Sequence, residues 1–256
     1  MNDVYPWCIV AFDSLQRTPA GRLDMITDLG FDSYAYDLDI KHLGDMESEF
    51  KLASDKHIEI RAVWLWLNAK RDSIGKLSSR NEGLFELVKQ SDHKPAFWLS
   101  FSPNFFANRT DDESFQIATD MILYVHKKAT ELDCKVELYN HGGWFGDPWN
   151  MVKLIQALSD LDLHMVYNFH HAHQDLVAYQ EVIELITPYL SAVNINGMRL
   201  DGPKILTVGE GDYEGEMIRL LKVNGYKGPW GILGHVKEED VRVVLERNMA
   251  WLRSSR

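Results

Sequence analysis

Eight short apolar runs, separated by longer stretches with the periodicity of amphipathic helices, constrain the fold of this chain most strongly. The runs begin near Trp7, Asp32, Ile58, Pro95, Cys134, Leu163, Leu190 and Pro229. Their spacing of roughly 25 to 40 residues suits one β-strand followed by one helix. Eight such units in 256 residues match the size of one α/β barrel. We therefore predict an α/β fold, a single (β/α)8 TIM barrel over residues 1–256.

Local patterns agree with this architecture. Residues 8–12, 62–67 and 96–101 are apolar throughout, which is typical of parallel strands buried on both faces. Thr18 and Pro19 begin a predicted helix and Gly30 ends it, as a cap, a first-turn proline and a terminal glycine do. Helical phase also runs through residues 115–132 and 217–221. The long polar connections 67–79 and 102–112 follow strands, so we expect both at the functional rim of the barrel.

Composition excludes several classes of partner. The net charge of −11, without a local basic patch, disfavours nucleic acid and acidic membrane surfaces. No window approaches about 18 uninterrupted apolar residues, and the first residues lack the basic and apolar regions of a secretion signal. Cys8 and Cys134 lie in separate apolar runs and are predicted to be reduced, buried thiols. We expect a soluble, cytoplasmic protein without a membrane partner.

Reacting groups in such barrels lie at the carboxyl ends of the strands and in the loops that follow. That criterion selects a strongly polar set: Asp13, Asp37, Trp66, Asn68, Ser100, Asn140, His141, Asn168, His170, His171, His173, Asn196 and His235. Imidazole titrates near neutral pH and binds metals readily, so the histidines in this set predict reacting chemistry.

The fifth unit combines a carboxylate with an imidazole. It reads Val-Glu-Leu-Tyr-Asn-His-Gly-Gly-Trp over residues 136–144. Alternation along a strand places Glu137, Tyr139 and His141 on one face, and Trp144 offers an aromatic surface to a sugar ring. The His-Gly-Gly sequence also occurs in esterase oxyanion loops, but the chain lacks a Gly-x-Ser-x-Gly nucleophile motif. The sequence therefore disfavours a serine hydrolase.

The sixth unit ends in Asn-Phe-His-His-Ala-His over residues 168–173. Alternation puts His171 and His173 on one face and Asn168 and His170 on the other, unless a turn has begun by His170. The three histidines therefore do not all point into the barrel, and we expect at least one of them to be functional.

The seventh and eighth units supply further polar groups. Glu210 and Asp212 carry negative charge into the loop where many barrels hold phosphate, which favours a neutral or cationic ligand there, or a capping role for Asp212. Lys204 is a cation near the predicted mouth, and His235 follows the last strand. The glycine spacing does not match a dinucleotide-binding motif, so no nucleotide cofactor is expected.

Three motifs resemble the xylose isomerase-like TIM-barrel superfamily of sugar phosphate isomerases and epimerases, which also includes a DNA-repair endonuclease branch. They are Leu-Tyr-Asn-His-Gly-Gly at 138–143, Val-Gly-Glu-Gly-Asp at 208–212, and the segments 225–228 and 230–233. The resemblance implies one divalent cation held by Glu, Asp, His and Glu at the ends of strands five to eight. This sequence has Tyr139, Asn168, Asn196 and His235 near those four positions. A shift of the alignment by two residues would put Glu137 in place of Tyr139 at the first Glu position. His171 matches a further family histidine, three residues after the Asp that Asn168 replaces.

Amides are poor ligands for a divalent cation, so two kinds of site remain open. One is a rearranged metal site for zinc or manganese that draws on His141, His171, His173, His235 and Glu210. The other is a metal-free pocket that works by imidazole acid/base chemistry.

The resemblance implies a carbohydrate substrate and proton abstraction next to a carbonyl group: isomerisation, epimerisation or elimination from a keto sugar. We predict that Glu137 or His141 removes the proton, that His171 or His173 returns it, and that His235 or a cation stabilises the enediolate. Trp66 and Trp144 would form the sugar platform. The remaining predicted substrate-binding residues are Asn140, Asn168, His173, Asn196, Lys204, Glu210 and His235.

Three alternative functions stay open at this point. A metal-dependent phosphodiesterase would need more carboxylate ligands and a basic face. A non-catalytic sugar-binding barrel would explain Tyr139, Asn168 and Asn196 as decayed ligands. A purely structural barrel leaves the polar rim unexplained.

Overall fold

A computed structural model describes residues 3–37, 43–236 and 238–254. Its strands are β1 (Val4–Trp7), β2 (Ser33–Tyr36), β3 (Glu59–Leu67), β4 (Ala96–Phe101), β5 (Val136–Tyr139), β6 (His164–Asn168), β7 (Leu190–Ile195) and β8 (Trp230–Leu233). Its α-helices are α1 (Pro19–Asp28), α2 (Leu43–Asp55), α3 (Ser79–Gln90), α4 (Asp111–Thr130), α5 (Gly143–Gly146), α6 (Pro148–Ala157), α7 (Tyr179–Ile186), α8 (Glu214–Val223) and α9 (Val241–Ser254).

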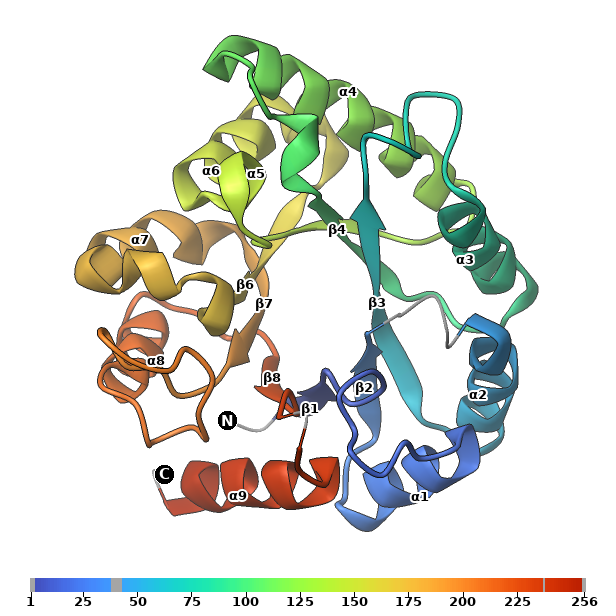
Figure 1. Cartoon of the computed structure of the whole chain (residues 1–256), viewed down its shortest axis with the longest axis vertical. Helices are drawn as coiled ribbons and strands as arrows, with labels where there is room; N and C mark the ends of the chain where they lie inside the picture. Colours follow the sequence, from blue (N-terminus) through green and yellow to red (C-terminus); the bar gives the residue numbers. More distant parts are fainter. Residues whose placement is uncertain (1–2, 38–42, 237, 255–256) are drawn as a thin grey trace.

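The eight strands form a nearly closed parallel barrel. They pair in the order β1-β8-β7-β6-β5-β4-β3-β2, and the two ends of this row, β1 and β2, lie beside each other (Figure 1). Helices surround the barrel on its outside (Figure 1). The predicted (β/α)8 TIM barrel is therefore confirmed. No helix within the described ranges is both long and apolar enough to cross a lipid bilayer.

The predicted start of the first helix follows the expected local chemistry. Thr18 precedes α1 and its side chain accepts a hydrogen bond from the backbone N–H of Gly21, while Pro19 occupies the first turn. Beyond the end of the helix, Gly30 has a φ of 80°, a conformation that glycine adopts without steric cost. Both thiols, Cys8 and Cys134, are free and buried, as predicted.

One predicted strand is wrong. Residues 8–10 are buried and residues 11–12 are half-buried, which accounts for their apolar character, but the segment forms the loop after β1, in which Cys8 has a φ of 57°. The carboxylate of Asp37 holds this loop, since it accepts hydrogen bonds from the backbone N–H groups of Ile9, Val10 and Ala11, each at 2.9 Å. A side chain therefore supplies the backbone partners that a strand would have found in the sheet.

Large aromatic rings fill the middle of the barrel. The Trp7 and Trp98 ring centroids lie 4.8 Å apart, and the ring of Trp98 stacks on Tyr139 at 5.7 Å. All three side chains are almost fully buried. We call Trp7, Trp98 and Tyr139 the aromatic layer. Because one cavity lies against it on each side, this layer separates the two ends of the barrel interior.

Candidate active site

A cavity of about 280 Å³ lies at the carboxyl ends of the strands. Its floor includes Trp7 and Tyr139 of the aromatic layer. The remaining lining residues come from strand ends and the loops after them: Cys8, Ala11, Phe12, Asp37, Trp64, Trp66, Arg80, His141, His170, His171 and His235. This is the end of the barrel at which enzymes with this architecture hold their substrates. We refer to it as the carboxyl-end cavity.

Four of the lining residues, His141, His170, His171 and His235, form what we call the histidine cluster. The ring centroids of His170 and His171 lie 3.7 Å apart, and those of His141 and His171 lie 4.4 Å apart. The ring centroid of His235 lies 5.6 Å from that of His170, and the His235 ring also packs against Phe12. The structure thus brings together three histidines assigned from the sequence, His141, His171 and His235. It adds His170, which the strand-end criterion had selected but to which no role was assigned.

A turn at the end of β6 explains why adjacent histidines line one cavity. Asn168 is the last residue of β6, and Phe169–His171 form a short 3-10 helix that abolishes the alternation of a strand. The Asn168 side chain begins this turn, because its Oδ1 accepts a hydrogen bond from the backbone N–H of His170. The turn considered in the sequence analysis is therefore present.

Burial favours the uncharged form of three imidazoles in this cluster, those of His141, His170 and His171. It lowers the pKa of His141 and of His171, and lowers that of His170 to about 3. The neighbouring histidines and Lys204 lower the His170 and His171 values further, since each disfavours another positive charge close by. At neutral pH each of these three rings therefore offers one N–H donor and one nitrogen lone pair.

Asn140 and Asn168 fix the ends of β5 and β6. The Oδ1 of Asn140 accepts a hydrogen bond from the backbone N–H of Asn168 at 2.7 Å, and its Nδ2 donates to the Asn168 carbonyl at 3.1 Å. The Asn168 Nδ2 donates to the hydroxyl of Tyr139 at 2.6 Å. Both amides are buried. These two predicted substrate-binding residues are therefore engaged within the protein and hold the strands that carry the histidines.

Aromatic side chains form one wall of the carboxyl-end cavity. Trp66, predicted as part of a sugar platform, lines the cavity beside Trp64, with ring centroids 6.3 Å apart. Arg80 lies over the ring of Trp64 at 5.9 Å. Trp144 is not part of this wall, because its indole N–H donates to Asp111 and its ring packs against Phe106. Trp64, which the sequence analysis missed, takes its place; it is two residues from Trp66 and therefore on the same strand face.

The carboxylate within the carboxyl-end cavity is Asp37. Burial raises its pKa to about 6, against the lowering effect of its three backbone hydrogen bonds. It follows β2 directly, which is why the strand-end criterion selected it, but no role was assigned to it. It shapes the loop after β1 and places a negative charge near Cys8.

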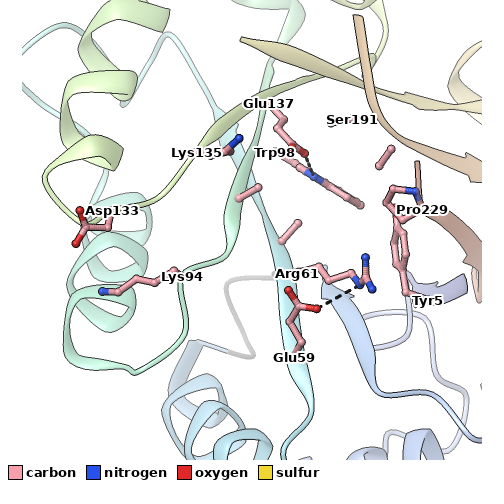
Figure 2. A pocket seen from close by; sticks show the side chains of 13 residues that line it. Tyr5, Glu59, Arg61, Lys94, Trp98, Asp133, Lys135, Glu137, Ser191 and Pro229 are labelled. Atoms are coloured by element: carbon pink, nitrogen blue, oxygen red, sulfur yellow. Dashed lines mark hydrogen bonds and ion pairs between the residues drawn. The ribbon is translucent and has the colours of Figure 1, made fainter. Parts of the chain in front are cut away.

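Glu137 does not lie with the histidines. It lines a second cavity of about 340 Å³ at the amino ends of the strands, which we call the amino-end cavity. There its Oε2 accepts a hydrogen bond from the indole N–H of Trp98 at 2.8 Å (Figure 2). Burial raises the pKa of Glu137. Tyr139 and the rest of the aromatic layer lie between this carboxylate and His141.

The other predicted residues lie outside the carboxyl-end cavity. His173 donates from Nε2 to the carbonyl of Arg199, and Asn196 donates to the carbonyls of Gly197 and Lys204. Lys204 is exposed and acts on the histidine cluster through its charge. Glu210 is exposed.

The loop before α8 is organised by different acidic groups from those the sequence singled out. Glu214 accepts hydrogen bonds from the backbone N–H groups of Gly209 and Gly211. Asp212 does not cap α8; it accepts from the backbone N–H of Leu200.

The donor set does not suit a divalent cation. Asn168 uses its amide, and Asn196 its Nδ2, in the hydrogen bonds described above. Within the described part of the chain, no three His, Cys, Asp or Glu side chains are arranged to hold a metal ion. Asn168 and Asn196 thus stand where carboxylate or histidine ligands were expected and are hydrogen-bonded within the protein, and Glu210 and His173 do not join the cluster.

The eight-stranded parallel barrel with its surrounding helices agrees with the fold that the sequence resemblance implied. No protein-family model matches the chain, and no curated protein matches it significantly in sequence. Solved structures do match. The IOLI protein, in a crystal structure with a bound zinc atom, has 13% identity and a TM-score of 0.77, covering 100% of this chain and 98% of that one.

Two sugar epimerases have the same fold. L-ribulose 3-epimerase has 13% identity and a TM-score of 0.72, covering 100% of this chain and 94% of that one. The 3-keto-D-glucoside 4-epimerase YcjR from E. coli has 15% identity and a TM-score of 0.68, covering 98% and 99%. At these identities the likeness concerns the fold.

Proposed function

We propose that this protein is a sugar isomerase or epimerase-like enzyme that moves a proton next to a carbonyl group of a small carbohydrate. The observation that carries the proposal is the histidine cluster in a cavity with tryptophan walls at the carboxyl ends of the strands. The two epimerases with the same fold act on sugars, as their names state.

The walls of the cavity suit a sugar. Trp64 and Trp66 present indole rings to the apolar face of a pyranose or an open-chain polyol, and imidazole nitrogens can pair with its hydroxyls. The volume of about 280 Å³ fits a small ligand better than a polymer. The acidic chain offers no general attraction to nucleic acid, which argues against the phosphodiesterase alternative.

The different basicities of His171 and His141 suit them to different catalytic roles. His171 has the most strongly lowered pKa, so its neutral N–H can donate a hydrogen bond to a carbonyl oxygen and stabilise the enediolate that forms. The pKa of His141 is less strongly lowered, which makes it the better proton acceptor. With ring centroids 4.4 Å apart, the two can address neighbouring atoms of one substrate.

These roles need no metal ligand and no contribution from Glu137. His141 would remove the proton from the carbon next to the carbonyl. In an isomerisation it would return the proton to the former carbonyl carbon. In an epimerisation it would return the proton to the opposite face of the original carbon, after the intermediate has turned in the site. Elimination from a keto sugar would begin with the same proton abstraction. We keep this lyase activity within the proposal, because the residues are the same.

Hydrogen exchange tests the proposal. Free ketoses, ketose phosphates and keto sugars would be incubated with the protein in D₂O, and deuterium next to the carbonyl would be measured by NMR and mass spectrometry. We expect exchange with at least one ketose or keto sugar, and its loss in His171→Ala. Saturable sugar binding without any exchange would instead identify a non-catalytic sugar-binding barrel.

A further inference from the structure

The hydrogen bonds around Asn168 determine which nitrogen of His170 carries a proton. A backbone N–H is always a donor, so the N–H of His170, 3.3 Å from one side-chain atom of Asn168, identifies that atom as the oxygen Oδ1. The amide nitrogen then faces Tyr139, to whose hydroxyl it donates at 2.6 Å. The orientation of the Asn168 amide is therefore set by the main chain.

The same oxygen fixes the imidazole. The Nδ1 of His170 lies 2.8 Å from Oδ1 of Asn168. Because an amide oxygen only accepts, Nδ1 must donate and therefore carries hydrogen. In the neutral ring, Nε2 then has the lone pair. The lowered pKa of His170 agrees with a ring that stays neutral in this environment.

We infer that His170 is a permanent hydrogen-bond acceptor in the carboxyl-end cavity, held in that state by Asn168, and that it binds a hydroxyl group of the sugar through Nε2. The inference rests on the proposed function for the identity of the ligand, but not for the state of the ring. His170 lines the cavity, and Nε2 lies across the ring from the nitrogen that Asn168 occupies. Asn168 is a positioning residue.

This assignment gives His170 and His171 different tasks. A ring with an unprotonated Nε2 cannot donate from that atom to a carbonyl or carboxylate oxygen; it selects a donor, and in a sugar the donors are hydroxyls. His170 therefore places the hydroxyl-bearing carbon, and His171 is left to polarise the carbonyl. In this arrangement the site binds one hydroxyl group through His170 and one carbonyl group through His171.

This arrangement explains why an amide, Asn168, can serve where the resemblance expects an aspartate. A carboxylate at position 168 has no hydrogen to donate to the Tyr139 hydroxyl, and it would bring a negative charge beside the histidine cluster. Asn168 instead donates to Tyr139 and accepts from His170, with no net charge. The amide orients an imidazole at the position where the resemblance expects a ligand of a cation.

Nitrogen-15 NMR of the full-length protein tests the state of the ring without any ligand. We expect the Nδ1 of His170 to have the chemical shift of a protonated nitrogen and Nε2 that of an unprotonated one, unchanged between pH 6 and pH 8. Resonances are assigned with His170→Asn. A His170 signal with hydrogen on Nε2 in the unaltered protein would overturn the inference.

Two variants separate positioning from general stability. Asn168→Ala removes the acceptor, so the His170 tautomer should shift towards hydrogen on Nε2. Tyr139→Phe removes the other partner of Asn168 but leaves Oδ1 in place, and the tautomer should stay as in the unaltered protein. If Asn168→Ala does not fold, Asn168→Asp is used, in which the Tyr139 hydroxyl must turn to donate and the pKa of His170 must rise. Unchanged His170 signals in Asn168→Ala, or an unchanged His170 titration in Asn168→Asp, would contradict the assignment.

The ligand claim has its own readout. For a sugar that binds, monodeoxy analogues are compared, and one analogue should bind roughly five- to tenfold more weakly than the parent, the effect of one lost hydrogen bond. In His170→Phe the parent and that analogue should bind equally. If the ratio survives in His170→Phe, His170 does not hold the hydroxyl. If no sugar binds, the proposed function fails while the tautomer result stands independently.

Discussion

The two ends of the barrel interior carry different chemistry. The carboxyl-end cavity has the histidine cluster and an indole wall beside Asp37 and Arg80, whereas the amino-end cavity has a half-buried carboxylate, Glu137, with Arg61, Lys94 and Lys135 also among its lining residues (Figure 2). The aromatic layer separates them. Glu137 lies within β5 and His141 follows the end of that strand, four residues further along the chain. Four residues of extended chain span about 13 Å. The position of a side chain along a strand therefore matters as much as the face on which it lies.

The largest expected effect concerns proton transfer. His141→Ala and His171→Ala should each lower the rate of deuterium exchange into a sugar substrate by roughly 10² to 10⁴-fold, the range for loss of an acid or base. Glu137→Gln, on the other side of the aromatic layer, should leave the rate unchanged. Initial rates measured by NMR at equal protein concentration test both. A Glu137→Gln variant as inactive as His171→Ala would refute the functional separation of the two ends.

The next effect is acid lability from the histidine cluster. The pKa of His170 is lowered to about 3 in the folded protein, so below its unfolded value near 6.5 the unfolded state binds more protons. Stability from this group is thus complete above pH 6.5 and is lost as the pH falls towards 3. Between pH 7 and pH 5 the loss amounts to about 2 kcal/mol for this one residue.

Urea unfolding of the unaltered protein and of His170→Asn at both pH values measures that contribution. The decrease from pH 7 to pH 5 should be smaller in the variant by about 2 kcal/mol, the value from the linkage relation. His57 is an exposed histidine whose replacement by Asn provides the matched control. An equal decrease in all three proteins would mean that His170 is not held neutral by burial.

The barrel and its functional rim were predictable because they follow from periodicity. Fully apolar strands and helix signals such as Thr18 and Gly30 are local properties of the sequence. The loop at residues 8–12 was mistaken for a strand because burial alone made it apolar. The side chain that binds the backbone of this loop, Asp37, lies more than twenty residues away in the sequence, and no local sequence pattern predicts that contact.

The composition of the site depended on tertiary contacts in the same way. His141, His171 and His235 could be selected, because each follows a strand. Trp144 and His173 also follow strands, but Asp111 and the Arg199 carbonyl hold them elsewhere. Periodicity predicts the backbone position of a residue. The direction of its side chain depends on hydrogen-bond partners that are distant in the sequence.

A smaller effect is expected at the amino end. Burial raises the pKa of Glu137, so this group binds a proton more readily in the folded than in the unfolded protein. Its contribution to stability therefore decreases as the pH rises from the unfolded-state pKa through the raised folded-state pKa. Glu137→Gln keeps an acceptor for the Trp98 indole and removes the charge. The variant should be more stable than the unaltered protein at pH 8, with the difference vanishing near pH 4. Urea unfolding at both pH values measures it, and a destabilised variant at pH 8 would show that neighbouring cations outweigh burial.

The smallest expected effect is that of metal removal. The Asp37 carboxylate lines the carboxyl-end cavity, but both of its oxygens accept backbone hydrogen bonds, and Asn168 uses its amide within the protein. The lining residues therefore offer no set of free charged oxygens of the kind that a divalent cation prefers. Exchange activity should therefore survive dialysis against EDTA, and elemental analysis should find less than one zinc or manganese per chain. Protein incubated with Mn²⁺ or Zn²⁺ and then desalted is the companion sample, and His171→Ala its control. Stoichiometric metal that is lost in His171→Ala, together with activity lost in EDTA, would replace the imidazole mechanism by a histidine-rich metal site. It would also end the contrast between a carboxyl end that works through imidazoles and an amino end lined by Glu137 and basic side chains.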